Sequence, residues 1–243
     1  MAERFYINAP IRLGRVALTG AEAHHIRDVC RLGVGAEVTL FNGDGAQYRA
    51  VICHSTKGQV VLEVTAREEI VRELPVHVAV AAPLPKGDRT QFLLEKLTEL
   101  GVGSFIPLRT RYSIRHPAET RRDKLQRYII EACKQCGRNR LMHLDQVRLW
   151  EDLVAQPDLP AERWLLDASG VPLAELRPSL SVVLVQPDPA ILIAAGPEGG
   201  WTREEIQMAR ARGFFIVSLG QRILRIETAA LAACAWVMVQ LGK

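Results

Sequence analysis

The chain has 243 residues, of which 48% are hydrophobic and 24% are charged, and its formal net charge is +4. This composition is that of a globular protein long enough to bury a sizeable core. No apolar run reaches the roughly 18 residues that a membrane span needs. The first residues, "MAERFYINAP", lack the apolar centre of a signal peptide. We therefore expect a cytoplasmic protein that does not associate with a membrane.

The first part of the chain, residues 1–73, predicts a small β-barrel. Its short segments alternate apolar and polar residues and are separated by turns, which is the pattern of half-buried strands. The sequence "NGDG" at residues 42–45 favours a tight hairpin, because Asn and Gly accept positive φ angles easily. One helix is expected at residues 20–32, and strands are expected at residues 4–8, 15–20, 37–43, 46–55 and 59–68.

Beyond Leu74 and Pro75 the pattern changes, and residues 74–243 predict a second, α/β domain. Apolar runs without alternation indicate strands that are covered on both faces, and segments of helical periodicity separate them, as in a parallel sheet. The expected strands are residues 76–84, 104–109, 163–168, 190–196 and 214–220. The expected helices are residues 88–101, 119–136, 202–213 and 227–242, the last of them apolar nearly all round.

Two glycine-bearing turns, "AAGPEGG" and "SLGQRILRIETAA", follow apolar strands and lead into helices. Ligands of open parallel sheets bind beyond the carboxyl ends of the strands. Glycines let the backbone approach a ligand closely, and a proline stiffens the turn. A tight strand-to-helix connection has the same pattern, so the pattern alone leaves both interpretations open. The motifs of phosphate loops, Rossmann dinucleotide sites and G-x-S-x-G hydrolases do not occur in the sequence.

Residues 109–140 are strongly basic. They contain ten Arg and Lys residues against three acidic residues, a net charge of +7, which leaves −3 for the remainder of the chain. A local basic field on a slightly acidic body indicates a face that binds a polyanion. A solvated helix surface would carry similar charges.

The five cysteines are scattered and odd in number, so they predict no disulfide framework and fit a reducing compartment. Cys133 and Cys136 have the spacing of half a zinc site, but no second pair accompanies them and they fall inside a predicted helix. We therefore expect no metal.

Five stretches in order resemble the ribosomal RNA small subunit methyltransferase E family of the SPOUT superfamily. They are "HHIRDVCRLGVGAEVTLFNGDGAQYRAVI", "LPKGDRTQFLLEKLTELGV", "EACKQCGRNR", "GPEGGWTREEI" and "LGQRILRIETAA". The resemblance implies a PUA-like β-barrel followed by an α/β domain with a deep trefoil knot, and a homodimer. It also implies S-adenosylmethionine as cofactor and methylation of N3 of a uridine in the decoding region of 16S ribosomal RNA, on the assembled small ribosomal subunit.

The resemblance also implies site residues. Two walls would enclose the cofactor, one of Ala195, Gly196, Pro197, Glu198 and Gly199, the other of Leu219, Gly220, Ile223, Leu224 and Thr228. Arg138 and Arg225 are candidates for stabilising negative charge on the uracil ring, and Glu198 is the candidate proton acceptor or, alternatively, a loop-fixing acceptor. The candidate RNA-binding residues are Lys86, Arg89, Arg109, Arg111, Arg115, Arg121, Arg122, Lys124, Arg127, Arg138 and Arg140.

Two other functions compete with this one. A non-catalytic RNA-binding assembly factor would need the basic segment but not the glycine-rich turns. A zinc-dependent deaminase would need a metal.

Overall fold

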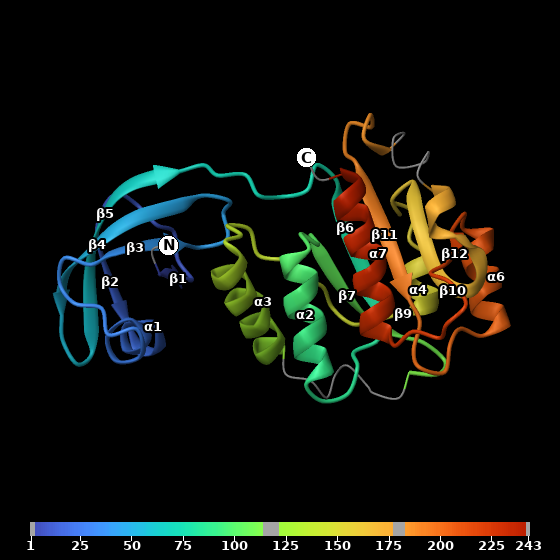
Figure 1. Ribbon diagram of the computed structural model, residues 1–243, viewed down its shortest axis with the longest axis horizontal. Coiled ribbons are helices and arrows are strands. Elements are labelled where there is room, and N and C mark those ends of the chain that lie inside the picture. Colours follow the sequence, from blue (N-terminus) through green and yellow to red (C-terminus); the bar gives the residue numbers. More distant parts are fainter. Residues whose placement is uncertain (1–2, 114–121, 177–182, 242–243) are drawn as a thin grey trace. The chain divides into compact units, whose positions relative to one another are not determined.

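The computed structural model describes residues 3–113, 122–176 and 183–241 (Figure 1). The chain splits into two compact units, Met1–Glu73 with Cys133–Leu141, and Leu74–Ala132 with Met142–Lys243. Residues Cys133–Leu141 therefore pack with the first unit, although they lie well inside the range expected for the second domain. The division into domains 1–73 and 74–243 stays a prediction.

The first unit contains a curled, five-stranded sheet with strand order β1-β3-β4-β5-β2 (Figure 1). β1 pairs with β3 in parallel, and the other neighbours are antiparallel. Its elements are β1 (Arg4–Tyr6), β2 (Gly14–Thr19), α1 (Gly20–His24), the π-helical turn η1 (His25–Val29), β3 (Glu37–Phe41), β4 (Gln47–Ser55) and β5 (Gln59–Glu68). The sheet is a half-barrel around one apolar core, in which Phe5, Ile26, Leu40, Ile52 and Leu62 are fully buried.

The "NGDG" hairpin joins β3 to β4, as the sequence predicts. Gly43 and Gly45 both have positive φ, at 91° and 102°. The Asn42 side chain accepts a hydrogen bond from the amide of Asp44 at 3.2 Å, and Asp44 accepts one from the amide of Ala46 at 2.8 Å. Side-chain acceptors thus satisfy the turn's backbone while glycine supplies its unusual angles.

Arginines hold the segment 137–140 within the first unit. Arg4 donates to the Asn139 side chain at 2.7 Å, and Arg72 donates to the carbonyl of Gly137 at 2.8 Å. The Arg138 guanidinium makes a two-pronged ion pair with Glu73, with Nε 3.1 Å from Oε1. Because Arg138 is only 3% exposed, this pairing satisfies a charge that would be costly to bury alone.

The second unit is built on a parallel sheet with strand order β12-β10-β11-β6-β7-β8, and β9 also pairs with β7. Its strands are β6 (His77–Ala82), β7 (Ser104–Arg109), β8 (His143–Leu144), β9 (Arg148–Leu149), β10 (Glu162–Pro172), β11 (Ala190–Ala195) and β12 (Phe215–Ser218). Its helices are α2 (Arg89–Glu99), α3 (Arg122–Cys136, whose end belongs to the first unit), α4 (Trp150–Val154), the 3-10 turn η3 (Leu173–Leu176), α6 (Arg203–Ala211) and α7 (Ile226–Leu241).

The two faces of this sheet are covered by different helices. α7 packs against β6 and β11 and also against α2. Alternate residues of the same strands, such as Ala79 and Leu192, join a second core with Trp150 of α4 and Ala209 of α6. β6 and β11 are buried along nearly their whole length. The parallel α/β arrangement expected from the unbroken apolar runs is therefore confirmed.

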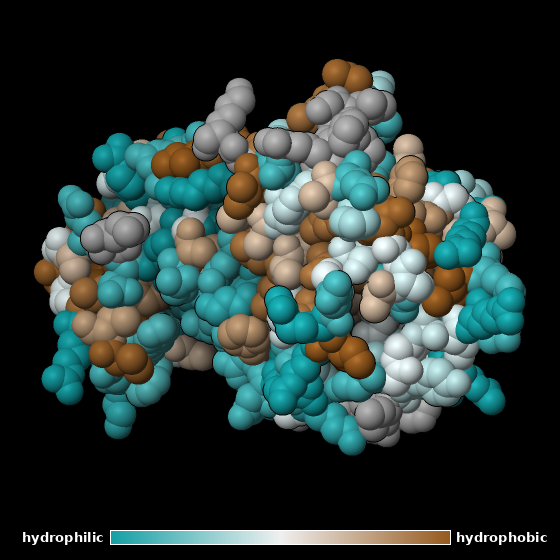
Figure 2. Space-filling model, turned by 45° about the vertical axis from the view of Figure 1, so that its right-hand side comes forward, coloured by the Kyte–Doolittle hydropathy of each residue, from teal (hydrophilic) through white to brown (hydrophobic). Residues whose placement is uncertain are grey.

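Among the described residues, no helix has the length and apolar character needed to cross a bilayer. Figure 2 shows polar side chains interspersed with smaller apolar patches on the visible face. Within α7, Val239 is 69% exposed, so this nearly all-apolar helix is not fully covered within one chain.

Candidate functional site

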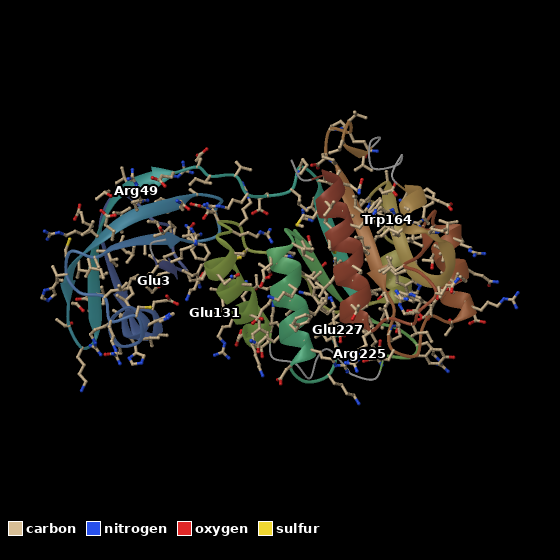
Figure 3. The ribbon with its side chains drawn as sticks, in the orientation of Figure 1. Glu3, Arg49, Glu131, Trp164, Arg225 and Glu227 are labelled. Carbon is tan, nitrogen blue, oxygen red and sulfur yellow. The ribbon has the colours of Figure 1, made fainter. Side chains whose placement is uncertain are left out.

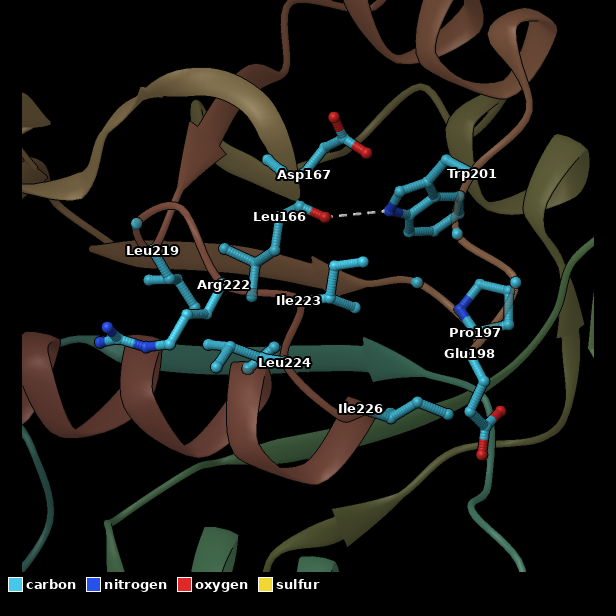
Figure 4. Close-up of a pocket in the computed structure, with 16 residues that line it drawn as sticks. Leu166, Asp167, Pro197, Glu198, Trp201, Leu219, Arg222, Ile223, Leu224 and Ile226 are labelled. Carbon is cyan, nitrogen blue, oxygen red and sulfur yellow. Dashed lines mark hydrogen bonds between the residues drawn. The ribbon is translucent and has the colours of Figure 1, made fainter.

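A pocket of about 280 Å³ lies at the carboxyl ends of β11 and β12 and beside the middle of β10, the strand between them (Figure 4). This volume is close to the lower end of the range of small-molecule sites, about 300–1,000 Å³. Three segments of the second unit line it, namely Leu166, Asp167 and Ala168; Gly196, Pro197, Glu198, Gly199, Gly200 and Trp201; and Leu219, Gly220, Arg222, Ile223, Leu224, Ile226 and Ala229.

The first wall of the pocket is the β10 segment 166–168. It reaches the pocket because β10 is irregular where it passes β12. Val217 pairs with Leu166 and again with Val171, so the residues between them leave the regular ladder. Asp167 stabilises this excursion by accepting from the amide and the hydroxyl of Ser169, at 2.9 and 2.6 Å. A Cβ on Gly170 would lie 2.4 Å from the backbone of Ile216, so only glycine fits there. The excursion places Leu166 and Asp167 at the pocket.

The second wall is the turn "GPEGG" after β11. A Cβ on Gly196 would lie 2.7 Å from the Trp201 indole nitrogen, and a Cβ on Gly199 would lie 2.9 Å from Cβ of Tyr112. Gly200, rather than Gly199, has the positive φ of 73°. The glycines therefore serve close approach at Gly196 and Gly199 and backbone conformation at Gly200.

Trp201 anchors this turn to the first wall. Its indole Nε1 donates to the carbonyl of Leu166 at 3.1 Å, the contact drawn in Figure 4. The ring is 8% exposed and packs on Trp150 with a centroid distance of 4.7 Å. The hydrogen bond runs from the residue before the N-cap of α6 to the middle of β10 and so links two sides of the pocket.

Glu205 fixes the other end of the same turn. It completes the capping box with Thr202, which the sequence predicts, and its Oε2 accepts from the Thr202 amide at 2.8 Å. Its Oε1 accepts from the amide of Arg111 at 2.9 Å. Glu205 is 3% exposed, so both of its carboxylate oxygens accept their hydrogen bonds within the protein interior. One buried carboxylate thus ties the loop after β7 to the start of α6.

The third wall is the loop from Leu219 to the start of α7. Gly220 has a φ of 108°, and the Ser218 hydroxyl accepts from its amide at 3.2 Å. Ile223 is 93% exposed although it lines the pocket. An exposed isoleucine beside a concave site is a surface that an apolar ligand group would cover.

The cofactor residues implied by the resemblance are mostly at this pocket. Gly196, Pro197, Glu198, Gly199, Leu219, Gly220, Ile223 and Leu224 line it. Ala195 is fully buried in β11 and Thr228 is exposed on α7, and neither is among the lining residues. Gly200, one of the glycines of the predicted ligand turn, lines the pocket as well, whereas sequence reasoning missed Leu166, Asp167, Ala168, Trp201, Arg222, Ile226 and Ala229. The rule on strand ends, applied to the predicted strand 163–168, would have found Asp167.

The candidate catalytic residues are placed differently from one another. Glu198 lines the pocket, and its Oε1 lies 3.4 Å from Nη2 of Arg89. Arg225 is exposed directly before α7. Arg138 belongs to the first unit, where it is buried against Glu73. Their roles stay proposals.

The candidate RNA-binding residues fall into three groups. Lys86, Arg109, Arg111, Lys124, Arg127 and Arg140 are exposed. Three have structural partners: Arg89 pairs with Glu198, Arg138 with Glu73, and Arg122 donates to the carbonyls of Leu144 and Asp145. Arg115 and Arg121 lie outside the described residues.

The "CKQC" cysteines behave as packed thiols. Cys133 is buried with its sulfur 3.5 Å from the carbonyl of Arg140, and Cys136 is half-buried. Within the described ranges, no cluster of three or more His, Cys, Asp or Glu residues could hold a metal ion. That the protein needs no metal stays a prediction.

Comparison with known proteins gives the family. Residues 72–238 match the family described as RNA methyltransferase domain, and residues 18–65 match the RNA methyltransferase PUA domain. A ribosomal RNA small subunit methyltransferase E from Synechocystis is 35% identical over 224 residues, which cover 91% of this chain and 72% of that protein. The chain belongs to the ribosomal RNA small subunit methyltransferase E family.

Other members of the methyltransferase E family agree. The protein of that name from Bacillus subtilis is 29% identical, with 92% of this chain and 90% of that protein covered. A methyltransferase E structure from Neisseria gonorrhoeae bound to S-adenosylmethionine has a TM-score of 0.87 at 30% identity, over 98% of both chains. A methyltransferase from Legionella pneumophila, solved with S-adenosylmethionine, gives the same values. The expected PUA-like and α/β methyltransferase architecture is thus confirmed, and the trefoil knot stays a prediction.

Proposed function

We propose that this chain transfers the methyl group of S-adenosylmethionine to N3 of a uridine in the decoding region of 16S ribosomal RNA, with the assembled small subunit as substrate. The observation that carries the proposal is the glycine-lined pocket at the ends of β11 and β12 and the middle of β10, in a chain of the methyltransferase E family. A cytoplasmic location follows from this substrate.

The residues of the pocket fit this cofactor. The glycine turn leaves no room for side chains at Gly196 and Gly199, so the backbone itself is the wall that an adenosine group would meet. Leu219, Ile223 and Leu224 offer apolar cover for a ring. Asp167 and Glu198 bring carboxylates that can accept hydrogen bonds from hydroxyl or amino groups. When bound, S-adenosylmethionine supplies a methyl group on a positively charged sulfur.

The chain's own residues must handle the uridine and its proton. N3–H of uridine is a weak acid hidden in base pairs, so the base must be unstacked or already single-stranded. Glu198 is the carboxylate at the pocket that we assign to accept this proton. Arg225, exposed at the end of the third wall, is the guanidinium assigned to stabilise negative charge spreading over the ring oxygens. Arg138, already paired with Glu73, is the weaker candidate for that role.

We further propose that the two predicted domains have different functions. Residues 1–73 would contribute RNA binding, in line with the PUA match, and residues 74–243 would bind the cofactor and dimerise. A homodimer would cover the apolar surface of α7, where Val239 is exposed and Trp236 is half-buried.

The deciding experiment incubates the purified protein with S-adenosylmethionine and either small subunits or free 16S RNA from a strain that lacks this gene. Mass mapping should find one 3-methyluridine in the decoding region, formed on the subunit. Methylation at another atom or nucleotide would overturn the specificity. An RNA-binding assembly factor would bind subunits but show no S-adenosylmethionine binding in calorimetry.

A further inference from the structure

A single guanidinium joins three segments around the pocket. Nη2 of Arg89 lies 3.4 Å from Oε1 of Glu198, and its Nη1 lies 3.6 Å from Oε1 of Glu227. Arg89 opens α2, Glu198 lies in the turn after β11, and Glu227 lies in the first turn of α7. Figure 3 labels Glu227 at the start of α7, the helix that packs against α2. Of the three residues, only Glu198 lines the pocket.

The position of Arg89 is unfavourable for its own helix. The start of an α-helix carries a partial positive charge, so a cation in the first turn is unfavourable. The N-cap residue, Asp88, brings a carboxylate to this end of α2 but makes no capping hydrogen bond, and the first turn itself holds no acidic residue. The two carboxylates come instead from elements more than a hundred residues further along the chain. Helix stability therefore does not account for an arginine at this position.

Glu227 is buried more deeply than its partners. Its side chain is 7% exposed, against 33% for Arg89 and 32% for Glu198. Its Oε2 is buried and has no hydrogen-bond partner among the described residues. An ionised carboxylate in the interior is costly unless a cation faces it, so Glu227 and Arg89 hold each other in place. The start of α7 adds favourable potential for the Glu227 charge.

We propose that Arg89 and Glu227 are positioning residues of the methyl-transfer site. Arg89 holds the Glu198 carboxylate at the rim of the pocket, and Glu227 holds Arg89. This inference rests on the proposed function, in which Glu198 accepts the N3 proton. A proton acceptor must keep a fixed distance and angle to the reacting nitrogen, and a displacement of about 1 Å can cost about 100-fold in rate. Arg89 thereby acts within the protein instead of on the RNA backbone.

The test uses Arg89→Met, Glu227→Gln, their combination and the conservative Arg89→Lys. Arg89→Met alone leaves Glu227 buried without its cation, so we expect loss of stability as well as activity. The double variant removes both charges and should recover the unfolding midpoint. If Arg89 positions Glu198, kcat of the double variant stays about 100-fold below wild type while KM for the cofactor changes little. Arg89→Lys should restore part of kcat, since it keeps the charge but not the two-pronged geometry.

A second readout needs no substrate. Denaturant unfolding of the ligand-free protein over the Arg89/Glu227 double-mutant cycle should be non-additive, because the two residues share one interaction. The matched cycle is Lys96→Met with Glu99→Gln, a solvent-accessible ion pair on the same helix, whose side chains are 40% and 30% exposed and whose Nζ lies 2.7 Å from Oε1. Exposed pairs contribute little, so that cycle should be nearly additive, and kcat should stay at the wild-type value.

The outcomes distinguish a failure of the positioning role from a failure of the proposed function. If the double variant recovers kcat together with stability, Arg89 only neutralises Glu227 and the positioning role is wrong. An additive Arg89/Glu227 cycle would show that Glu227 does not hold Arg89, which also overturns the proposal. If the wild-type protein methylates no RNA, the proposed function fails, while the unfolding cycle still decides whether the two residues are coupled.

Discussion

The indole nitrogen of Trp201 donates a hydrogen bond to the backbone carbonyl of Leu166 across the pocket, at 3.1 Å. This bond joins the glycine turn after β11 to β10 at the residue where its pairing with β12 becomes irregular. The two residues are 35 positions apart in sequence, and both line the pocket.

Trp201→Phe should keep the buried ring and remove only the donor. The carbonyl of Leu166 then loses its partner, which we expect to cost about 0.5–1.5 kcal/mol in urea unfolding. Because the bond also sets the separation of two walls, the affinity for S-adenosylmethionine should fall in calorimetry. Trp150→Phe is the matched control: it removes a 3.2 Å bond to the carbonyl of Glu205 but does not line the pocket. Equal affinity losses in both variants would contradict the assignment.

Gly199→Val should abolish cofactor binding and leave the protein folded. A Cβ at this position would lie 2.9 Å from Cβ of Tyr112, so a valine here would displace the turn that lines the pocket. Tyr112 is 50% exposed, so its loop can move without opening the core. Calorimetry and circular dichroism measure the two effects. Gly58→Val, where an added Cβ meets nothing within 4 Å, should change neither. An unfolded Gly199→Val protein would make this glycine structural.

Lys124→Ala with Arg127→Ala should weaken RNA binding and its salt dependence. Both side chains are exposed on α3, whereas the neighbouring Arg122 bonds to backbone carbonyls and is a poorer choice. Removing one cation that touches a phosphate should lower the slope of log affinity against log salt by about 1. Arg203→Ala with Arg210→Ala removes the same charge from α6 and should have a much smaller effect. An unchanged slope for the α3 pair would remove it from the RNA face.

The alkaline stability of the protein should depend on Cys234. Burial raises the pKa of this thiol from 9.0 to about 12. Below pH 9 the thiol is protonated in both folded and unfolded chains and has no effect. Between pH 9 and about 12 only the unfolded chain releases the proton, so stability falls as the pH rises, at up to about 1.4 kcal/mol per pH unit. Cys234→Ala should flatten this part of the profile, and Cys53→Ala, at an exposed site, should leave its slope in place.

Val239→Asp should disrupt the proposed homodimer. The residue is 69% exposed on a helix whose other residues are almost all apolar, so a charge there would be buried in a dimer but not in a monomer. Sedimentation velocity should show a monomer that remains folded. Val34→Asp adds the same charge at a site that is 68% exposed in the first unit and should leave the mass unchanged. A dimeric Val239→Asp protein would place the interface elsewhere.

Local patterns in the sequence were sufficient for much of the fold. The hairpin at residues 42–45 and the capping box of Thr202 and Glu205 depend on residues within a few positions of one another, and both were predicted. The unbroken apolar runs of β6 and β11 identified strands covered on both faces. The two glycine turns were recognisable because a strand, a turn and a helix follow directly in the chain.

Only the tertiary structure decided which residues far apart in the sequence contact one another. Periodicity does not reveal that β10 lies between β11 and β12, and this order is what brings Leu166 and Asp167 to the pocket. Arg138 and Arg89 looked alike as basic residues in the sequence. Folding places one against Glu73 and the other between Glu198 and Glu227. The charge of an arginine is set by its type, but its role depends on which carboxylates folding brings within reach, because such interactions act over only a few ångströms.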